Sequence, residues 1–286
     1  MKLEGHFEMN RPIPLLMTAS VDTLGMKWAC FSPKERYPMY LDAITFYISV
    51  VYGQIEGVKI VFVENSGWDL TSFHDDLSRQ FGSEIVDERV EFIALDPQLF
   101  DITKGKGYNE LLLINHAIER SATIRQAGYF FKVTGRYPIF NAARFLKDAA
   151  KSFDKGYNFY CDIKNHNLYQ RLGLSWRGHS FEARLWGSKV DFYKENISQH
   201  YTQCYDYDER FVEVIIYKEL SLITDSFRNA KAKGISLRFP REPRFGGVEG
   251  SVIDAVSFSR NQQSLKSKAK IGVGNFIRIF MPWFKF

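Results

Sequence analysis

Residues 129–141 read YFFKVTGRYPIFN, an apolar run that ends abruptly in polar and charged residues. The first six residues are aromatic or β-branched apart from Lys132, a composition that favours a buried strand. Thr134, Gly135 and Arg136 follow where that strand should end. In a parallel sheet, ligands bind beyond the carboxyl ends of the strands. We therefore expect a central strand whose end carries binding residues.

Three further short apolar runs have the composition of strands, and helical patterns lie between them. The runs span residues 14–21, 58–64 and 90–95. Residues 33–53 and 109–121 place apolar side chains at helical spacing. Strand, helix and strand in repetition predict an α/β fold. We expect a Rossmann-type, mostly parallel sheet with helices on both faces.

Composition and cysteine usage exclude several classes of protein. Of the 286 residues, 45% are hydrophobic and 25% charged, which is typical of a globular chain with a full core. Cys30, Cys161 and Cys204 are too few and too far apart for a disulfide framework or a zinc site, so a reducing cytoplasm is expected. The N-terminal segment is polar and broken by prolines, which does not suit a signal peptide. The longest apolar runs fall far below the ~20 residues of a membrane span.

Positive charge is concentrated at the C-terminal end of the chain. The formal net charge is +5, and no acidic residue follows Asp254. The basic residues beyond it are Arg260, Lys266, Lys268, Lys270, Arg278 and Lys285. Because Phe, Ile and Trp are mixed with these cations, residues 256–286 suit a tail that lies on an anionic membrane. A terminal element docked on the body is the alternative, and nucleic acid is not expected because no binding motif accompanies the charge.

The predicted carboxyl ends of the strands carry small polar, acidic and basic side chains. They are Thr18, Ala19 and Ser20 after the first strand, Glu64 and Asn65 after the second, and Lys132, Thr134, Gly135 and Arg136 after the fourth. This set suits an anionic ligand that forms hydrogen bonds, such as a nucleotide with phosphates. Arginine offers such a ligand a planar fork, and lysine a point charge.

Residues 104–110, KGKGYNE, combine two lysines and two glycines ahead of a helical pattern. The glycines permit close approach of a phosphate, and a helix that opens near Asn109 or Glu110 favours anions at its N-terminus. The stretch is not G-x-x-x-x-G-K-[ST] and lacks G-x-G-x-x-G, so neither an ATPase nor a dinucleotide site is supported. An ordinary exposed loop is the alternative interpretation.

Taken in order, these segments resemble bacterial glycosyltransferases from polysaccharide and lipopolysaccharide gene clusters, of the GT-A-like, nucleotide-sugar type. The similarity covers roughly residues 14–195, with a looser likeness at PREPRFGGVEGS. It is carried by TASV, a helix with Arg36 and Tyr37, VFVENSG, KGYNELLLINHAIE and YFFKVTGRYPIFN. The most specific part is GKGY followed about 25 residues later by KVTGRY.

The resemblance implies a nucleotide-sugar donor and assigns parts of the site. TAS and ENS would surround the base and ribose. The expected residues around the phosphates and sugar are Lys106, Gly107, Tyr108, Glu110, Lys132, Thr134, Gly135 and Arg136. Arg244, within the Arg- and Gly-rich segment of residues 238–250, would lie on a loop over the phosphates, and an exposed disordered loop is the alternative.

One departure from this family concerns its metal. Most GT-A enzymes end the central strand in Asp-x-Asp, which holds a divalent cation, whereas this chain has Thr134, Gly135 and Arg136. Fixed cations can neutralise leaving-group charge in the metal's place, so we expect metal-independent transfer without a cofactor. A literal Asp-x-Asp occurs at residues 206–208, but it precedes a helical pattern and not a strand, so helix-capping acids are expected there.

A transfer that inverts the anomeric carbon needs a general base for the acceptor hydroxyl. The candidates are Glu182 and Asp191, with Asp162 a further acid in the same half of the chain. Glu182 followed by Arg184 and Trp186 fits the pattern of the resembled family. A strand-edge carboxylate paired with Arg184 is the alternative, and inversion and retention both stay open.

These patterns predict a glycosyltransferase that extends a growing bacterial surface glycan, lipid-linked or in lipopolysaccharide, at the inner face of the inner membrane. We expect a single catalytic domain over residues 1–255, with a donor half at about 12–141 and an acceptor half at about 142–255, followed by the tail. A sugar nucleotidyltransferase and a non-catalytic glycan-binding assembly protein are the alternatives.

Overall fold

The computed structural model describes residues 11–27, 29–165, 178–247 and 273. The tail expected at 256–286 lies outside them, apart from Val273. The strands are β1 (Ile13–Ala19), β2 (Val58–Glu64), β3 (Val90–Ala94), β4 (Tyr129–Thr134), β5 (Phe159–Tyr160), β6 (Ile163–Asn165), β7 (His179–Phe181), β8 (Leu185–Lys189) and β9 (Ile235–Ser236). The α-helices are α1 (Pro33–Phe46), α2 (Thr71–Phe81), α3 (Ser83–Arg89), α4 (Lys106–Arg120), α5 (Ala122–Ala127), α6 (Ala142–Asp154), α9 (Val190–Asn196) and α10 (Val212–Ile223).

Within the described residues, seven strands form one sheet in the order β3-β2-β1-β4-β8-β5-β9. β3, β2, β1 and β4 are mutually parallel, and β8 runs antiparallel to both β4 and β5. The predicted α/β, mostly parallel sheet is therefore confirmed. From β1 the chain adds β2 and then β3 on one side of β1, and it then returns to add β4 on the other side of β1. The carboxyl ends of β1 and β4 thus meet at a switch in strand order, where ligands bind in sheets of this kind.

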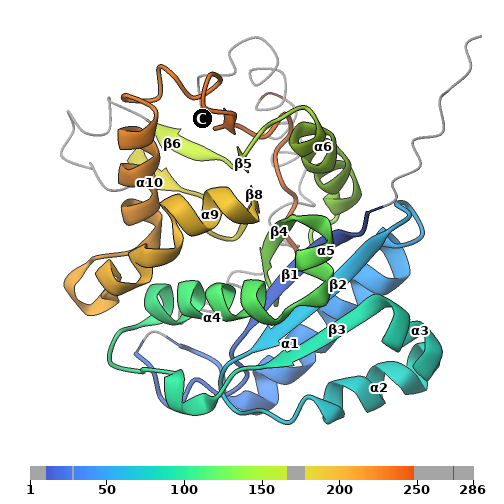
Figure 1. Cartoon of the computed structure of the whole chain (residues 1–286). Helices are drawn as coiled ribbons and strands as arrows, with labels where there is room; N and C mark the ends of the chain where they lie inside the picture. The colour runs from blue at the N-terminus through green and yellow to red at the C-terminus, as the bar shows by residue number, and fades with distance from the viewer. Residues whose placement is uncertain (1–10, 28, 166–177, 248–272, 274–286) are drawn as a thin grey trace, which may run out of the picture.

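Helices cover both faces of the sheet, as Figure 1 shows. The core on one face packs β1, β2 and β4 against α1, α2, α3 and α6. The core on the other face packs the same strands against α4, α5, α9 and α10. Side chains alternate between these faces along β4, so Phe131 and Val133 belong to the first core and Phe130 to the second. Lys132 shares the parity of Phe130 and therefore points toward α4.

The first helix and the KGKGYNE stretch differ slightly from expectation. α1 begins after Ser32, whose backbone N–H donates to Glu35 at 2.8 Å, and the chain continues as a π-helical turn over Tyr47–Val51. α4 begins at Lys106, three residues earlier than the pattern indicated. Lys106 and Gly107 are therefore the first turn of a helix, and only Lys104 and Gly105 belong to the preceding loop.

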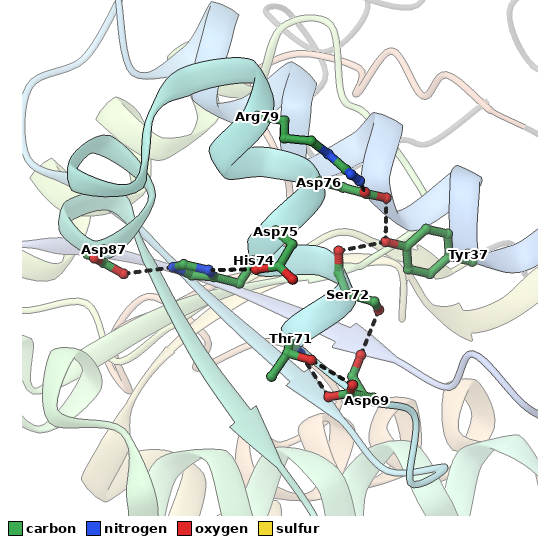
Figure 2. Close-up of polar contacts among 9 residues, drawn as sticks. All are labelled: Tyr37, Asp69, Thr71, Ser72, His74, Asp75, Asp76, Arg79 and Asp87. Carbon is green, nitrogen blue, oxygen red and sulfur yellow. Dashed lines mark hydrogen bonds and ion pairs between the residues drawn. The ribbon is translucent and has the colours of Figure 1, made fainter.

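Polar contacts join α2 to its neighbours at the outer side of the sheet (Figure 2). The hydroxyl of Tyr37 on α1 lies 2.7 Å from the carboxylate of Asp76. His74 Nε2 lies 3.0 Å from Asp87 on α3. These contacts hold α1, α2 and α3 together.

Among the helices of the described residues, none has the length and apolar character needed to cross a membrane.

Candidate active site

Gly135 lies where the ends of β1 and β4 approach each other most closely. Its N–H donates to the carbonyl of Thr18 at 2.9 Å. A Cβ atom at this position would lie 2.7 Å from that carbonyl oxygen and 3.2 Å from the ring of Tyr40. Only glycine fits such a contact. The glycine after the central strand is therefore required by backbone packing at the site.

Lys132 is fully buried, and its ammonium group is saturated with partners. Its Nζ lies 2.7 Å from Glu110 Oε1 on α4, 2.6 Å from the carbonyl of Ala183 and 3.1 Å from Thr134 Oγ1. The hydroxyl of Thr18 donates to the same Glu110 oxygen at 3.0 Å. Because an ammonium has three donors, Lys132 has none left for a phosphate. In this structure Lys132 fixes Glu110 against the sheet and presents no free charge.

Glu64 and Asn65, expected near the base and ribose, organise the loops after β1 and β2. Buried Glu64 accepts hydrogen bonds from the backbone N–H groups of Val21, Ser66 and Trp68 and from the Ser66 hydroxyl. Burial raises the pKa of Glu64, and these hydrogen bonds act against that rise. Asn65 Oδ1 accepts from the hydroxyl of Ser20 at 2.6 Å. Both side chains hold the strand ends in shape.

Three cations converge beside these loops: Arg36 from α1, Lys106 from α4 and Arg136 from the end of β4. We call them the cation cluster. Burial, together with the charges of Arg136 and Arg36, lowers the pKa of Lys106 to about 8, against an opposing effect of Asp206. Mutual repulsion among three cations is relieved when an anion binds between them. The cluster is therefore a candidate anion site.

The members of the cation cluster differ in how far they are engaged. Arg36 Nε donates to the carbonyl of Ser20 at 2.8 Å, and its Nη2 to the hydroxyl of Tyr40 at 3.0 Å. Arg136 instead has buried Nε and Nη1 atoms with no hydrogen-bond partner among the described residues. Burial opposes its charge, yet Tyr40, Tyr137 and Glu110 raise the pKa of Arg136 overall. Arg136 thus holds two unused donors on a permanent cation.

The N-terminus of α4 already holds an anion from the protein itself. Asp206 Oδ2 accepts from the backbone N–H of Lys106 at 2.6 Å and from that of Gly107 at 3.4 Å. A Cβ on Gly105 would lie 2.6 Å from Asp206, so glycine is needed at this contact. Asp206 is a helix-capping acid as expected, but it caps α4 and not the following α10. A phosphate was expected at the start of this helix, but its first two N–H groups are used by this carboxylate.

Four carboxylates from separate segments lie near α4 and α10. Glu110 is paired with Lys132, Asp206 with the N–H groups of α4, and Glu182 with Arg184 through two contacts of 2.7 Å. The pairing with Arg184 is the alternative that the sequence left open for Glu182. The fourth, Glu213 in the first turn of α10, has its pKa raised to about 7 by burial, with Glu110, Asp206 and Glu182 adding to the effect.

The remaining expected site residues are spread over the fold. Asp191 is exposed and follows Lys189, which pairs with Tyr129 at the start of β4, so it lies at the opposite edge of the sheet. Arg244 is exposed, and its segment is tied to residues 138–140 by a bridge between Ile139 and Phe245.

Two other expected residues lie on β1 and on α4. Ala19 ends β1 in register with Glu64. Tyr108 packs its ring 5.3 Å from that of Tyr201.

Two cavities differ in position and character. One of about 10 Å³, the size of a single water, is lined by the Glu110 carboxylate and otherwise by apolar side chains such as Trp186 and Val212. An open hollow of about 490 Å³ lies at the far side of the sheet, between Lys155 and Lys233. In the described part of the chain, no three His, Cys, Asp or Glu side chains gather as a metal-binding group.

Reasoning from the sequence missed three residues of this region. Arg36 shares the buried face of α1 with Tyr40 and Ala43, and a charged residue on a buried helical stripe was a usable signal. Asp206 as the cap of α4 and Glu213 as its neighbour had no such signal. Asp206 meets α4 through a contact 100 residues apart in the chain, and Glu213 follows Val212, which packs against Gly107 of α4.

No protein-family model and no curated protein sequence matches the chain. Among solved structures it is similar to a mannosyltransferase from Pyrobaculum calidifontis in complex with GDP-Man and Mn²⁺, with 10% identity, a TM-score of 0.38 and 65% of this chain covered. The chain spans about half of that protein, 47%. It is also similar to the galactosyltransferase LgtC in complex with donor and acceptor sugar analogues, with 13% identity, a TM-score of 0.43, and 71% of this chain and 69% of that one covered.

A third similarity is to mouse xyloside xylosyltransferase 1, with 9% identity, a TM-score of 0.38, and 75% of this chain and 83% of that one covered. All three likenesses are too weak to assign an activity.

Proposed function

We propose that this chain is a GT-A-type glycosyltransferase that moves a sugar from a nucleotide-sugar donor to a hydroxyl of a growing bacterial surface glycan. The observation that carries the proposal is the cation cluster at the carboxyl ends of β1 and β4. It lies at the switch in strand order of a mostly parallel sheet. The motif resemblance in KGYNE and KVTGRY supports the same donor.

Arg136 is the residue best suited to bind the diphosphate of the donor. Its Nε and Nη1 atoms are buried and without partners among the described residues, and a guanidinium matches two phosphate oxygens at once. Lys106 adds a second cation, and Arg36 a third that also fixes the loop after β1. When the bond between sugar and phosphate breaks, negative charge grows on the phosphate, and these fixed cations stabilise it.

The proposal includes transfer without a divalent metal. The segment after β4 carries Thr134, Gly135 and Arg136, where related enzymes would carry two aspartates. Arg136 and Lys106 supply positive charge at the place where a metal ion would act. Activity that persists in EDTA, with no gain on adding manganese or magnesium, is the expected result. Loss in chelator that manganese or magnesium restores would contradict metal independence.

The donor site is tested by a thermal-shift screen of UDP-, GDP-, dTDP- and CMP-sugars. A nucleotide sugar that binds the native state raises the melting temperature. Arg136→Ala should reduce that shift and lower the rate of nucleoside phosphate release by about 100-fold, because it removes a charge-assisted donor to the developing anion. Its apo melting temperature should change less than the donor-induced shift, since Nε and Nη1 have no protein partners to lose and only the contacts of the guanidinium with Tyr40 and Tyr137 are removed.

Arg228→Ala is the matched control for Arg136→Ala. Arg228 is an exposed arginine ahead of β9, so its removal changes net charge equally without touching the cation cluster. Failure of every nucleotide sugar to raise the melting temperature would overturn the proposal. Equal losses of activity and stability in Arg136→Ala would return this residue to a structural role.

The products separate this proposal from its alternatives. A glycosyltransferase releases a nucleoside mono- or diphosphate, whereas a sugar nucleotidyltransferase releases pyrophosphate. A non-catalytic glycan-binding assembly protein would bind no donor. We propose that the acceptor is a lipid-linked glycan or lipopolysaccharide at the inner face of the inner membrane. The basic, aromatic composition of residues 256–286 supports this, because such a segment binds anionic membranes.

A further inference from the structure

Glu213 lies in the first turn of α10, at the point where this helix meets the start of α4. A Cβ atom on Gly107 would lie 3.1 Å from the Cβ of Val212, the residue before Glu213. The first turns of the two helices are therefore in contact. Glu213 belongs to the second half of the chain, whereas the cation cluster comes from the first.

Glu213 is the one member of the four-carboxylate group that the fold leaves uncommitted. Glu110 is bound to Lys132 and Thr18, Asp206 caps α4, and Glu182 is bound to Arg184. No other described residue forms a hydrogen bond or ion pair with the Glu213 carboxylate, which interacts with its own backbone N–H. Glu213 is half-buried, and a carboxylate that is partly withdrawn from water without a structural partner is a candidate for a functional site.

The cation cluster gives this carboxylate a position relative to a ligand. Arg136 has two buried donors without partners, and the same Glu110 acts electrostatically on both Arg136 and Glu213. Asp206 likewise acts on both Lys106 and Glu213. Lys106 of the cluster lies in the first turn of α4, which contacts the first turn of α10, so a diphosphate held by the cluster would lie beside the turn that carries Glu213.

We propose that Glu213 accepts the proton of the acceptor hydroxyl during glycosyl transfer. This inference rests on the proposed function and names a further catalytic residue for it. The acceptor oxygen forms a bond to the anomeric carbon while the bond from that carbon to the phosphate oxygen breaks. The bonding electron pair leaves with the phosphate, where the cation cluster stabilises it. The hydroxyl proton passes to the Glu213 carboxylate, so atoms and charge balance.

The surroundings of Glu213 suit a base that works at neutral pH. Burial raises the pKa of Glu213 to about 7, and Glu110, Asp206 and Glu182 act in the same direction. A general base is most effective when its pKa lies near the working pH. The other titratable and charged groups on α10 and the elements around it include Lys106, His179, Arg184, His200, Tyr201, Arg210, Tyr217, Lys218 and Glu219.

Glu213→Gln tests the inference, because the amide keeps the size of the side chain and cannot accept a proton. The probe is the nucleotide sugar with the largest thermal shift, with octyl glycosides of glucose, galactose, mannose and N-acetylglucosamine as acceptors and water as the acceptor in donor hydrolysis. We expect nucleoside phosphate release to fall by about 100-fold or more while the thermal shift by the donor is unchanged.

The pH profile provides a readout that a structural role would not move. The carboxylate form of Glu213 grows as pH rises through about 7, so the wild-type rate should rise through that range and then level off. This acid limb should vanish in Glu213→Gln and persist in Glu213→Asp, which keeps a carboxylate should the amide variant fail to fold. Glu195→Gln, an exposed change on α9, is the matched control.

Two results would overturn the role of Glu213. One is Glu213→Gln with a wild-type rate and pH profile, and the other is loss of the acid limb in Glu182→Gln alone. Both require an active wild type, so they are distinct from failure of the proposed function. That failure would show as no donor binding and no nucleoside phosphate release by the wild type itself.

Discussion

At the residue scale, Lys132 on β4 and Arg136 just after it are both cations, but one is paired within the protein and the other keeps donors for a ligand. Lys132 and Arg136 are four positions apart in one stretch. The ammonium of Lys132 contacts three acceptors, and it has no exposed surface. Arg136 keeps two donors without partners. The residue types alone indicate positive charge at a strand end, but only the partners decide which charge a ligand can use.

Lys106 gives the site a pH dependence whose sign follows from its surroundings. Burial and the charges of Arg136 and Arg36 lower the pKa of Lys106 to about 8. A bound diphosphate stabilises the ammonium and raises this pKa again. Donor binding should therefore take up a fraction of a proton near pH 8, and affinity should be constant below that pH and fall as pH rises through it.

The measurement is isothermal titration calorimetry at pH 8 in two buffers that differ in ionisation enthalpy, with the nucleotide sugar found by the thermal-shift screen. The difference in observed enthalpy gives the number of protons taken up. Lys106→Arg keeps a positive charge that does not titrate in this range, so it should abolish the uptake. Proton release, or no exchange in the wild type, would contradict the assignment.

At the element scale, the start of α4 is set by a residue that follows it by 100 positions. The backbone N–H groups of Lys106 and Gly107 bind Asp206, and Gly105 leaves room for that carboxylate. Beside it, Val212 at the start of α10 packs against Gly107, which places Glu213 near α4. A glycine-rich stretch ahead of a helix is compatible with phosphate binding and with internal capping alike. In this protein the anion at the start of α4 is the side chain of Asp206.

Asp206→Ala should lower the free energy of unfolding by about 1 kcal/mol or more, because it removes the cap of α4. Urea denaturation monitored by circular dichroism measures the change. Asp208→Ala is the matched control: Asp208 is exposed and lies 3.7 Å from Arg210, a surface pair whose loss costs little. Equal stability of Asp206→Ala and the wild type would show that the contact contributes nothing to α4.

At the scale of the whole molecule, charge is divided between the sheet edge and the C-terminal tail. Residues 256–286 combine basic side chains with Phe, Ile and Trp, and contain no acidic residue. Removal of residues 265–286 should release the protein from vesicles that contain phosphatidylserine, since each basic residue near an anionic surface contributes about 1 kcal/mol. Co-sedimentation with these vesicles and with neutral phosphatidylcholine vesicles measures the effect.

A second tail variant separates charge from apolar contact. Replacing Lys266, Lys268, Lys270, Arg278 and Lys285 by glutamine keeps every aromatic residue of the tail. Binding that falls in this variant and in high salt assigns the attraction to charge. Unchanged partitioning of the truncated chain would contradict the membrane role, whatever the activity of the catalytic domain.

The α/β architecture could be predicted because it depends on local pattern. The strands at 58–64 and 129–134 match their expected bounds, and the first and third differ by one or two residues at their ends. Short apolar runs between amphipathic stretches leave few arrangements other than a parallel sheet covered on both faces. Gly135 and the polar strand ends could be predicted for the same reason, because they interrupt the apolar pattern where each strand ends.

The partners of each site residue were decided by the tertiary structure alone. The sequence determined that cations, small polar residues and carboxylates would meet at one edge of the sheet, since parallel strands end together. It did not determine that Glu110 forms an ion pair with Lys132, that Arg184 forms one with Glu182, or that Asp206 caps α4. Apolar periodicity records which face of an element is buried, whereas pairing between charges depends on contacts across the fold that leave no period in the chain.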